Sequence, residues 1–261
     1  MEIYNDLEES ILKKLNLMLN NKKEYHGMWR IIPSLFITEI ICQSEYDFQI
    51  LDAEHGSYSF ESIHNDIRIC KSLKCRAYVR VSGLNKVEVQ KCLDLGADGI
   101  VFPQLSSYED FYTATKLMNF PNQGNRGFNP FVPAGKYGFE KLDDNSKCIV
   151  IVETIEAVKN LDKILSINRI DIIYIGAYDL SSQLNCAGEM RDPKLLELID
   201  EIIVKSLKYS KEVGLIIDSK INYEYYKKLG VSYFVHLVES FQIKKSLKNI
   251  IDNIKINKCP D

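Results

Sequence analysis

Short apolar runs rich in β-branched residues alternate along the chain with longer stretches in which apolar residues recur at helical spacing. This alternation is typical of repeated strand–helix units built around a parallel sheet. Each predicted strand is followed by an amphipathic stretch of about ten or more residues. We count eight units, whose strands are predicted to begin near Trp29, Phe48, Ala77, Gly99, Ile149, Ile172, Leu215 and Tyr233.

Eight strand–helix units favour closure into a barrel. The length of 261 residues agrees, because a (β/α)8 barrel typically needs about 250 residues. The competing fold is a doubly wound open sheet, which usually shows a glycine-rich phosphate-binding turn after its first strand, and no such turn is present. The sequence therefore predicts an α/β protein with one domain over residues 1–261, a (β/α)8 TIM barrel.

Two segments stand outside the strand–helix alternation. Residues 3–20, within an extension over residues 1–25, predict an extra helix that covers the barrel bottom or a neighbouring subunit. Residues 119–146 are dense in Gly, Pro and Asn, which in a compact domain usually marks a functional loop or lid. Arg126 lies in that loop, and we expect it to brace the loop.

Composition narrows the function. The net charge is only -3 and the lysines are scattered, so no nucleic-acid or membrane-binding surface is indicated. The acidic start and the absence of an apolar run near the roughly 20 residues of a membrane span predict neither export nor an anchor. Seven cysteines without a Cys-x-x-Cys pair, mostly within apolar stretches, predict buried reduced thiols and a cytoplasmic protein.

Charged residues follow several predicted strands directly. In a barrel the loops after the strands converge on one open face, where the side chains that do chemistry lie. Glu153 and Asp179 follow the fifth and sixth strands, close enough to share one hard cation, and such a carboxylate pair suits Mg²⁺ or Mn²⁺. Equally, Asp179 could cap the following helix and Glu153 could pair with a lysine. Position alone leaves both interpretations open.

Three more residues at strand ends fit enolate chemistry. Arg80 could stabilise a developing oxyanion, and His55 could move a proton near neutral pH. Either residue alone is more often structural, so it is their convergence that favours catalysis. Gly176 precedes a helix start, whose free N–H groups would favour a substrate carboxylate, although a single glycine there could equally form a tight turn.

At these residues the chain resembles the HpcH/HpaI aldolase family. These are metal-dependent (class II) pyruvate aldolases, including 2-dehydro-3-deoxyglucarate and 4-hydroxy-2-oxoheptanedioate aldolases, on barrels of the phosphoenolpyruvate/pyruvate type. The likeness runs from about Gly27 to the last strand. Its motifs are Asp52-Ala53-Glu54-His55-Gly56, Val79-Arg80, Leu93-Asp94-Leu95-Gly96-Ala97, Phe120-Pro121, Gly124-Asn125-Arg126-Gly127, Val152-Glu153-Thr154 and Asp179-Leu180-Ser181.

The resemblance implies an activity and roles for these residues. Pyruvate, or another 2-oxo acid, and an aldehyde would be joined into a 4-hydroxy-2-oxo acid, or released from it. A divalent metal, Mg²⁺ or Mn²⁺ with Co²⁺ as a further candidate, would be held by Glu153 and Asp179, with Arg80 at the enolate oxygen. His55 would assist proton transfer at the aldol hydroxyl.

The resemblance also implies an assembly. In the family the histidine is supported by acidic residues, which here are Asp52 nearby and Asp94 from a neighbouring subunit. A homo-oligomer, a hexamer or a trimer, follows from the resemblance.

Departures from the family pattern concern the substrate more than the metal. Ala177 and Tyr178 replace a usual proline and alanine, Ile151 replaces a glutamine, Val81 a proline, and the eighth strand ends in Val238-Glu239-Ser240. Together with Gly176, the positions Tyr178 and Ile216 are expected to contact substrate.

Two alternatives remain open. One is an acyl-CoA lyase of the citryl-CoA and malyl-CoA branch, which typically shows Asp-Leu-Glu-Asp where this chain has Asp52-Ala53-Glu54-His55. The other is a catalytically degenerate barrel that acts as a binding subunit. The retained Glu153, Asp179, Arg80 and His55 argue against it, because a dead barrel has no physical reason to keep unpaired charges together.

Overall fold

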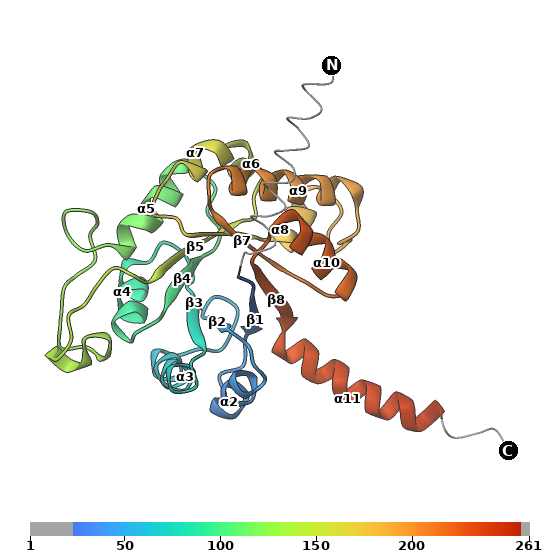
Figure 1. The fold of residues 1–261 in the computed structure, drawn as a ribbon, viewed down its shortest axis with the longest axis horizontal. Coiled ribbons are helices and arrows are strands. Elements are labelled where there is room, and N and C mark those ends of the chain that lie inside the picture. Colours follow the sequence, from blue (N-terminus) through green and yellow to red (C-terminus); the bar gives the residue numbers. More distant parts are fainter. Residues whose placement is uncertain (1–22, 257–261) are drawn as a thin grey trace.

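Eight parallel strands form a closed barrel in sequential order, and β8 closes on β1 (Figure 1). This computed structural model describes residues 23–256. The predicted (β/α)8 TIM barrel is confirmed, and an open sheet is excluded. The strands are β1 (Tyr25–Arg30), β2 (Phe48–Asp52), β3 (Arg76–Arg80), β4 (Gly99–Phe102), β5 (Lys147–Val152), β6 (Ile172–Ile175), β7 (Glu212–Ile216) and β8 (Tyr233–Val238).

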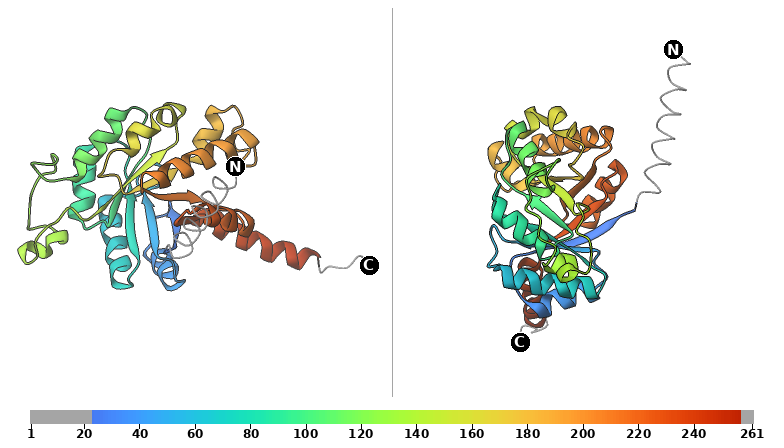
Figure 2. Two further views of the ribbon diagram at one scale, coloured as in Figure 1. Left: turned by 45° about the horizontal axis from the view of Figure 1, so that its top comes forward. Right: turned by 90° about the vertical axis from the view of Figure 1, so that its left-hand side faces the viewer.

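Helices surround the barrel (Figures 1 and 2). Several begin at a side-chain cap, as where Ser59 accepts from the backbone N–H of Ser62 and Ser107 accepts from that of Asp110. The helices are α2 (Leu35–Gln43), α3 (Phe60–Ser72), α4 (Lys86–Asp94), α5 (Tyr108–Met118), α6 (Ile155–Lys159), α7 (Leu161–Leu165), α8 (Ala177–Gln183), α9 (Pro193–Lys208), α10 (Lys220–Leu229) and α11 (Glu239–Ile256).

Alternation along each strand decides which side chains reach the site. One apolar cluster fills the barrel interior and a larger one lies between the sheet and the helices. In β5, Ile149 and Ile151 belong to the interior cluster, whereas Val150 and Val152 belong to the outer one. Because side chains alternate with a period of two, the next residue, Glu153, is directed over the barrel interior.

Two strands begin earlier than their apolar pattern indicated. Strand β1 begins at Tyr25 instead of near Trp29, and β7 begins at Glu212 instead of near Leu215. Most of these early residues are polar or glycine, as in Tyr25-His26-Gly27, so the hydropathy pattern does not mark the start of either strand. The helix expected at residues 3–20 lies outside the described residues.

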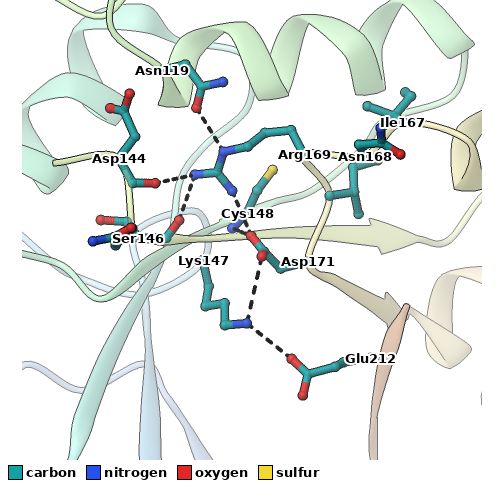
Figure 3. A network of polar contacts seen from close by, with 12 residues as sticks. Asn119, Asp144, Ser146, Lys147, Cys148, Ile167, Asn168, Arg169, Asp171 and Glu212 are labelled. Carbon is teal, nitrogen blue, oxygen red and sulfur yellow. Dashed lines mark hydrogen bonds and ion pairs between the residues drawn. The ribbon is translucent and has the colours of Figure 1, made fainter. Parts of the chain in front are cut away.

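Residues 119–146 connect α5 to β5 and contain a short 3-10 helix, Pro133–Gly138. Arg169 anchors both ends of this loop (Figure 3). Its guanidinium donates to the Asn119 side chain at 2.8 Å and to the carbonyls of Asp144 and Ser146 at 3.1 and 2.7 Å. The loop connects a helix to the start of a strand, so it lies at the end of the barrel opposite the carboxyl ends of the strands. The expectation that it forms a lid over the site of its own chain is therefore wrong.

Arg126 braces this loop, as expected. The side chain is 2 % exposed, stacks on Phe120 with its guanidinium carbon 4.5 Å from the ring centroid, and donates to Asp94 at 3.0 Å. Asp94 is the last residue of α4, so this ion pair holds the loop against α4.

Helix α11 leads away from the barrel (Figures 1 and 2). Ile243, Leu247, Ile250 and Ile254 recur along it at helical spacing and are 41–61 % exposed. Within the described part of the chain, nothing buries this stripe. None of the helices between residues 23 and 256 combines the length and hydropathy that crossing a membrane requires.

Candidate active site

A cavity of about 170 Å³ opens at the carboxyl ends of the strands. Six residues to which the sequence analysis gave a role in metal or substrate binding line it: Arg80, Glu153, Gly176, Tyr178, Asp179 and Ile216. They come from β3 and β7 and from the residues just after β5 and β6, so the barrel gathers residues far apart in the chain. The other lining residues are Trp29, Ile151, Tyr174, Ile175, Ala177 and Val238.

Glu153 is a buried carboxylate, 5 % exposed, directly after β5. One oxygen accepts the backbone N–H of Gln104, and no lysine pairs with it among the described residues. Burial, together with the negative charges of Asp179 and Glu54, raises the pKa of Glu153 to about 7. A Cβ at Gly176 would lie 2.9 Å from Glu153 Oε2 and closer still to its Cβ, so only glycine leaves room for this side chain.

Asp179 is the third residue of α8, and Gly176 is the N-cap. The alternative that Asp179 is the N-cap of the helix is therefore wrong, and between residues 23 and 256 the structure offers no lysine partner for Glu153. The Asp179 carboxylate is exposed and close enough to disfavour the charged form of Glu153. Two repelling carboxylates, one of them buried, form a set of hard oxygen donors that suits a divalent cation.

Arg80 is held on three sides. Its Nε donates to Asp52 Oδ1 at 2.9 Å, its Nη2 donates to Asp52 Oδ2, and its Nη1 lies 3.0 Å from Glu54 Oε2. The guanidinium carbon lies 4.7 Å from the centroid of the Trp29 ring. Burial alone would raise the pKa of Asp52, but the hydrogen bonds and charge of Arg80, with the Trp29 indole N–H, hold it below its usual range.

His55 is mostly exposed, with 68 % of its side chain accessible. Its Nε2 lies 3.9 Å from Glu54 Oε2. Asp52 accepts the backbone N–H of His55 at 3.1 Å and makes no hydrogen bond to the imidazole. Within this chain Asp52 thus orients Arg80 and the turn that carries His55. Asp94 pairs with Arg126 at the other end of the barrel and does not join this chain's site. A contribution of Asp94 to a neighbouring subunit stays a prediction.

Sequence reasoning missed three residues of the site. Glu54 lies inside a quoted motif, but its role depends on the turn after β2, which directs it toward Arg80. Gln104 connects two strand ends, because its side chain donates to Glu54 at 2.5 Å and its backbone N–H donates to Glu153. Gln104 could have been found from the sequence, because it is a polar residue shortly after the fourth strand, where side chains reach the open face of the barrel. Trp29 carried no such signal.

Comparison of the sequence with known proteins finds aldolases. The profile of the HpcH/HpaI aldolase/citrate lyase family matches residues 26–221. The 4-hydroxy-2-oxo-heptane-1,7-dioate aldolase of Escherichia coli is 24 % identical over 213 residues, covering 79 % of this chain and 81 % of that protein. The 2-dehydro-3,6-dideoxy-6-sulfogluconate aldolase of Pseudomonas putida is 25 % identical over 204 residues, covering 76 % and 80 %.

Solved structures share the fold over nearly the whole chain. An HpcH/HpaI aldolase/citrate lyase family protein of Burkholderia cenocepacia J2315 has a TM-score of 0.85 at 20 % identity, covering 93 % of this chain and 99 % of that one. The citrate synthase SbnG has a TM-score of 0.81 at 26 % identity, covering 92 % and 97 %. Since the family profile matches well over half of the sequence, this chain belongs to the HpcH/HpaI aldolase/citrate lyase family.

Proposed function

We propose that this protein is a divalent-metal-dependent pyruvate aldolase, an aldehyde-lyase of the EC 4.1.2 type. It would form or cleave a 4-hydroxy-2-oxo acid, with pyruvate or another 2-oxo acid and an aldehyde as the partners of the reaction. The observation that carries the proposal is one cavity lined by Glu153, Asp179 and Arg80 at the catalytic face of a barrel. The aldolases among the relatives support the same reaction class.

Glu153 and Asp179 are the residues that would hold the cation. Mg²⁺ and Mn²⁺ match the oxygen donors, and Co²⁺ is a further candidate. When bound, the cation would polarise the 2-oxo group as a Lewis acid and so lower the cost of forming the enolate. The raised pKa of Glu153 supports this assignment, because a buried carboxylate beside like charges is favoured when a cation neutralises it.

Three parts of the chain itself would act on the substrate. Arg80, fixed by Asp52 and Glu54, would stabilise the negative charge that develops on the substrate oxygen. Helix α8 has no side-chain cap after Gly176, so its first N–H groups are suited to the substrate carboxylate. Tyr178 and Ile216 border the same cavity and would contact the part of the substrate that comes from the aldehyde.

Exchange of pyruvate methyl protons for deuterium tests the proposed function. With Mg²⁺ or Mn²⁺, proton NMR should show enzyme-dependent loss of the methyl signal, because formation of the enolate releases a methyl proton. EDTA should reduce the exchange to the uncatalysed rate, and added metal should restore it. Absence of exchange with every metal, in protein shown to be folded by circular dichroism, would contradict the proposal.

Acyl-CoA chemistry is the second candidate, favoured by the likeness to SbnG, a citrate synthase. Its methyl donor would be acetyl-CoA in place of pyruvate. The same experiment separates the two, since exchange of the acetyl-CoA methyl protons without exchange in pyruvate would assign the CoA reaction. His55, where the citryl-CoA and malyl-CoA branch typically carries aspartate, favours the aldolase.

His55→Ala should separate enolate formation from the aldol step. The imidazole is exposed at the mouth of the site and outside the cavity lining, so pyruvate methyl exchange should stay within about twofold of the wild type. Aldol cleavage should slow by about 100-fold or more, because it needs a proton acceptor at the hydroxyl. Steady-state cleavage of a 4-hydroxy-2-oxo acid measures this. His64→Ala on α3 is the matched control, and equal cleavage rates in both variants would remove His55 from the mechanism.

We also propose a homo-oligomer, a hexamer or a trimer, as the resemblance implies. The exposed stripe of Ile243, Leu247, Ile250 and Ile254 supports it, since a second copy could bury these side chains. In light scattering the wild type should have the mass of several chains, and Leu247→Asp combined with Ile250→Asp should lower it. Lys248→Asp on the same helix should leave it unchanged. A monomeric wild type would refute the proposal.

A cytoplasmic location is proposed on the state of the thiols. All six cysteines among the described residues are free, and five of them are buried. Free thiols persist in the reducing cytosol. Recovery of the native protein in a membrane or secreted fraction would contradict this location.

A further inference from the structure

Three cysteines meet at the end of the barrel opposite the candidate active site. Cys42 lies in the last turn of α2, Cys70 lies in the last turn of α3, and Cys75 directly precedes β3. Their sulfur atoms all lie within 4.8 Å of one another, and the Sγ atoms of Cys42 and Cys70 are 3.9 Å apart. The three residues are 8, 0 and 4 % exposed, so the sulfurs form a small buried cluster between the sheet and two helices.

A buried amide is directed at this cluster. Gln49 Nε2 lies 3.1 Å from the sulfur of Cys42, and 3.6 and 4.0 Å from those of Cys70 and Cys75. The same nitrogen donates to the carbonyl of Thr38 at 3.1 Å, which leaves one N–H for the sulfurs. A donor of this kind stabilises sulfur in the thiolate form, which is the form that binds metals.

A positive charge lies behind the amide. Arg30 Nη1 donates to Gln49 Oε1 at 2.5 Å, and Arg30 is fully buried. A guanidinium in this position polarises the amide and favours negative charge on the sulfurs.

We propose that Cys42, Cys70 and Cys75 form a site for one Cu(I) ion, bound by three thiolates. Soft thiolate ligands suit Cu(I), Zn²⁺ and iron–sulfur clusters, and the clusters are typically held by four cysteines where this site has three. Zn²⁺ takes four ligands in structural sites, and none of the described residues supplies a fourth to this cluster, because Gln49 Oε1 is engaged by Arg30 and an amide nitrogen does not ligate. Three coplanar sulfurs at roughly 2.3 Å from an ion lie roughly 4.0 Å apart, close to the 3.9 Å between Cys42 and Cys70.

Other buried cysteines show what plain core packing looks like here. Cys92 and Cys148 are completely buried as well. Neither lies in a group of three or more potential metal-binding side chains among the described residues. The cluster around Cys42 differs because three thiols meet there and the amide of Gln49, which is bonded to the Arg30 guanidinium, is directed at them.

Occupation of the site would tie the end of α2 to the end of α3 and the start of β3. A ligand that binds only the folded state stabilises it by mass action, so Cu(I) should raise the melting temperature. The candidate catalytic residues lie at the other end of the barrel, so catalysis does not depend on this site.

Competition against a coloured Cu(I) chelator tests the proposal. The protein would be fully reduced and carry Cys186→Ser and Cys259→Ser, which removes the half-buried thiol and the one outside the described residues. This protein should retain one equivalent of Cu(I), and X-ray absorption should show three sulfur ligands. Cys42→Ser and Cys75→Ser should lose the tight equivalent, whereas Cys92→Ser should keep it. Gln49→Glu, which keeps an acceptor for Arg30 but removes the donor to sulfur, should weaken binding about 10- to 100-fold.

Several outcomes would overturn the site. These are failure to retain Cu(I) against the chelator, equal retention in Cys42→Ser and Cys92→Ser, a two-sulfur shell, or Zn²⁺ displacing Cu(I) at equal concentration. Circular dichroism of each metal-free variant verifies folding. If the serine variants do not fold, the sulfur count in the parent protein and the effect of Gln49→Glu decide the question.

Discussion

Glu153→Gln is expected to reduce metal-dependent exchange of pyruvate methyl protons by at least about 1000-fold. A Lewis-acid cation contributes several kcal/mol of charge stabilisation, and each 1.4 kcal/mol corresponds to about tenfold in rate. Glutamine is nearly isosteric and keeps an oxygen that can accept the Gln104 N–H. It lacks the negative charge that the site offers to a cation. Proton NMR of pyruvate in D₂O with Mn²⁺ measures the loss.

Stability separates this effect from damage to the fold. Burial raises the pKa of Glu153, which means that its charged form is costly in the metal-free protein. A neutral glutamine removes that cost, so the metal-free variant should melt at or above the temperature of the metal-free wild type. Glu156→Gln, on an exposed position in the first turn of α6, is the matched control and should retain full exchange. Substantial metal-dependent exchange in Glu153→Gln would refute the metal site.

Arg80→Lys should slow the exchange by about 100-fold or more while the protein still folds. Lysine keeps the charge but cannot donate to both oxygens of Asp52 and also approach Glu54 as the guanidinium does. The charge would therefore no longer be held where the substrate oxygen becomes negative. The KM for pyruvate should change less than kcat, because the interaction is strongest in the transition state. Initial exchange rates across a range of pyruvate concentrations measure both.

A second substitution at Arg80 tests its structural role. Arg80→Ala leaves the fully buried Asp52 without its ion-pair partner, and removing one partner of a buried pair typically costs about 3–5 kcal/mol of stability. Its melting temperature should fall well below that of Arg80→Lys. Arg76→Lys at the other end of β3 is the matched control, since Arg76 stacks on Tyr25 away from the cavity. If Arg80→Lys and Arg76→Lys exchange at the same rate, Arg80 has no part in the reaction.

Local pattern was sufficient for the architecture and for much of the site. Eight apolar runs separated by helical stretches predicted the barrel, because a strand and a helix each impose their period on neighbouring residues. The charged residues that directly follow those runs were predictable for a similar reason, since strands of a barrel all present their carboxyl ends on one face. In this way Glu153, Asp179 and Arg80 were identified as neighbours before any geometry was known.

Contacts between distant residues required the tertiary structure. Asp52 was expected to support His55, but it binds Arg80 and Trp29, because the turn after β2 points the imidazole toward solvent. Gln104 joins Glu54 to Glu153 across two strand ends, a pairing that no local pattern encodes.

The three-thiol cluster shows the same division. The apolar surroundings of most cysteines in the sequence predicted that they are buried, and five of the six among the described residues are. Only the packing of α2 on α3 decided that Cys42, Cys70 and Cys75 meet beside Gln49. The spacing of apolar residues along a helix or strand predicts which of its faces is buried. It does not report which side chain of another element lies opposite, because that depends on how the elements pack in three dimensions.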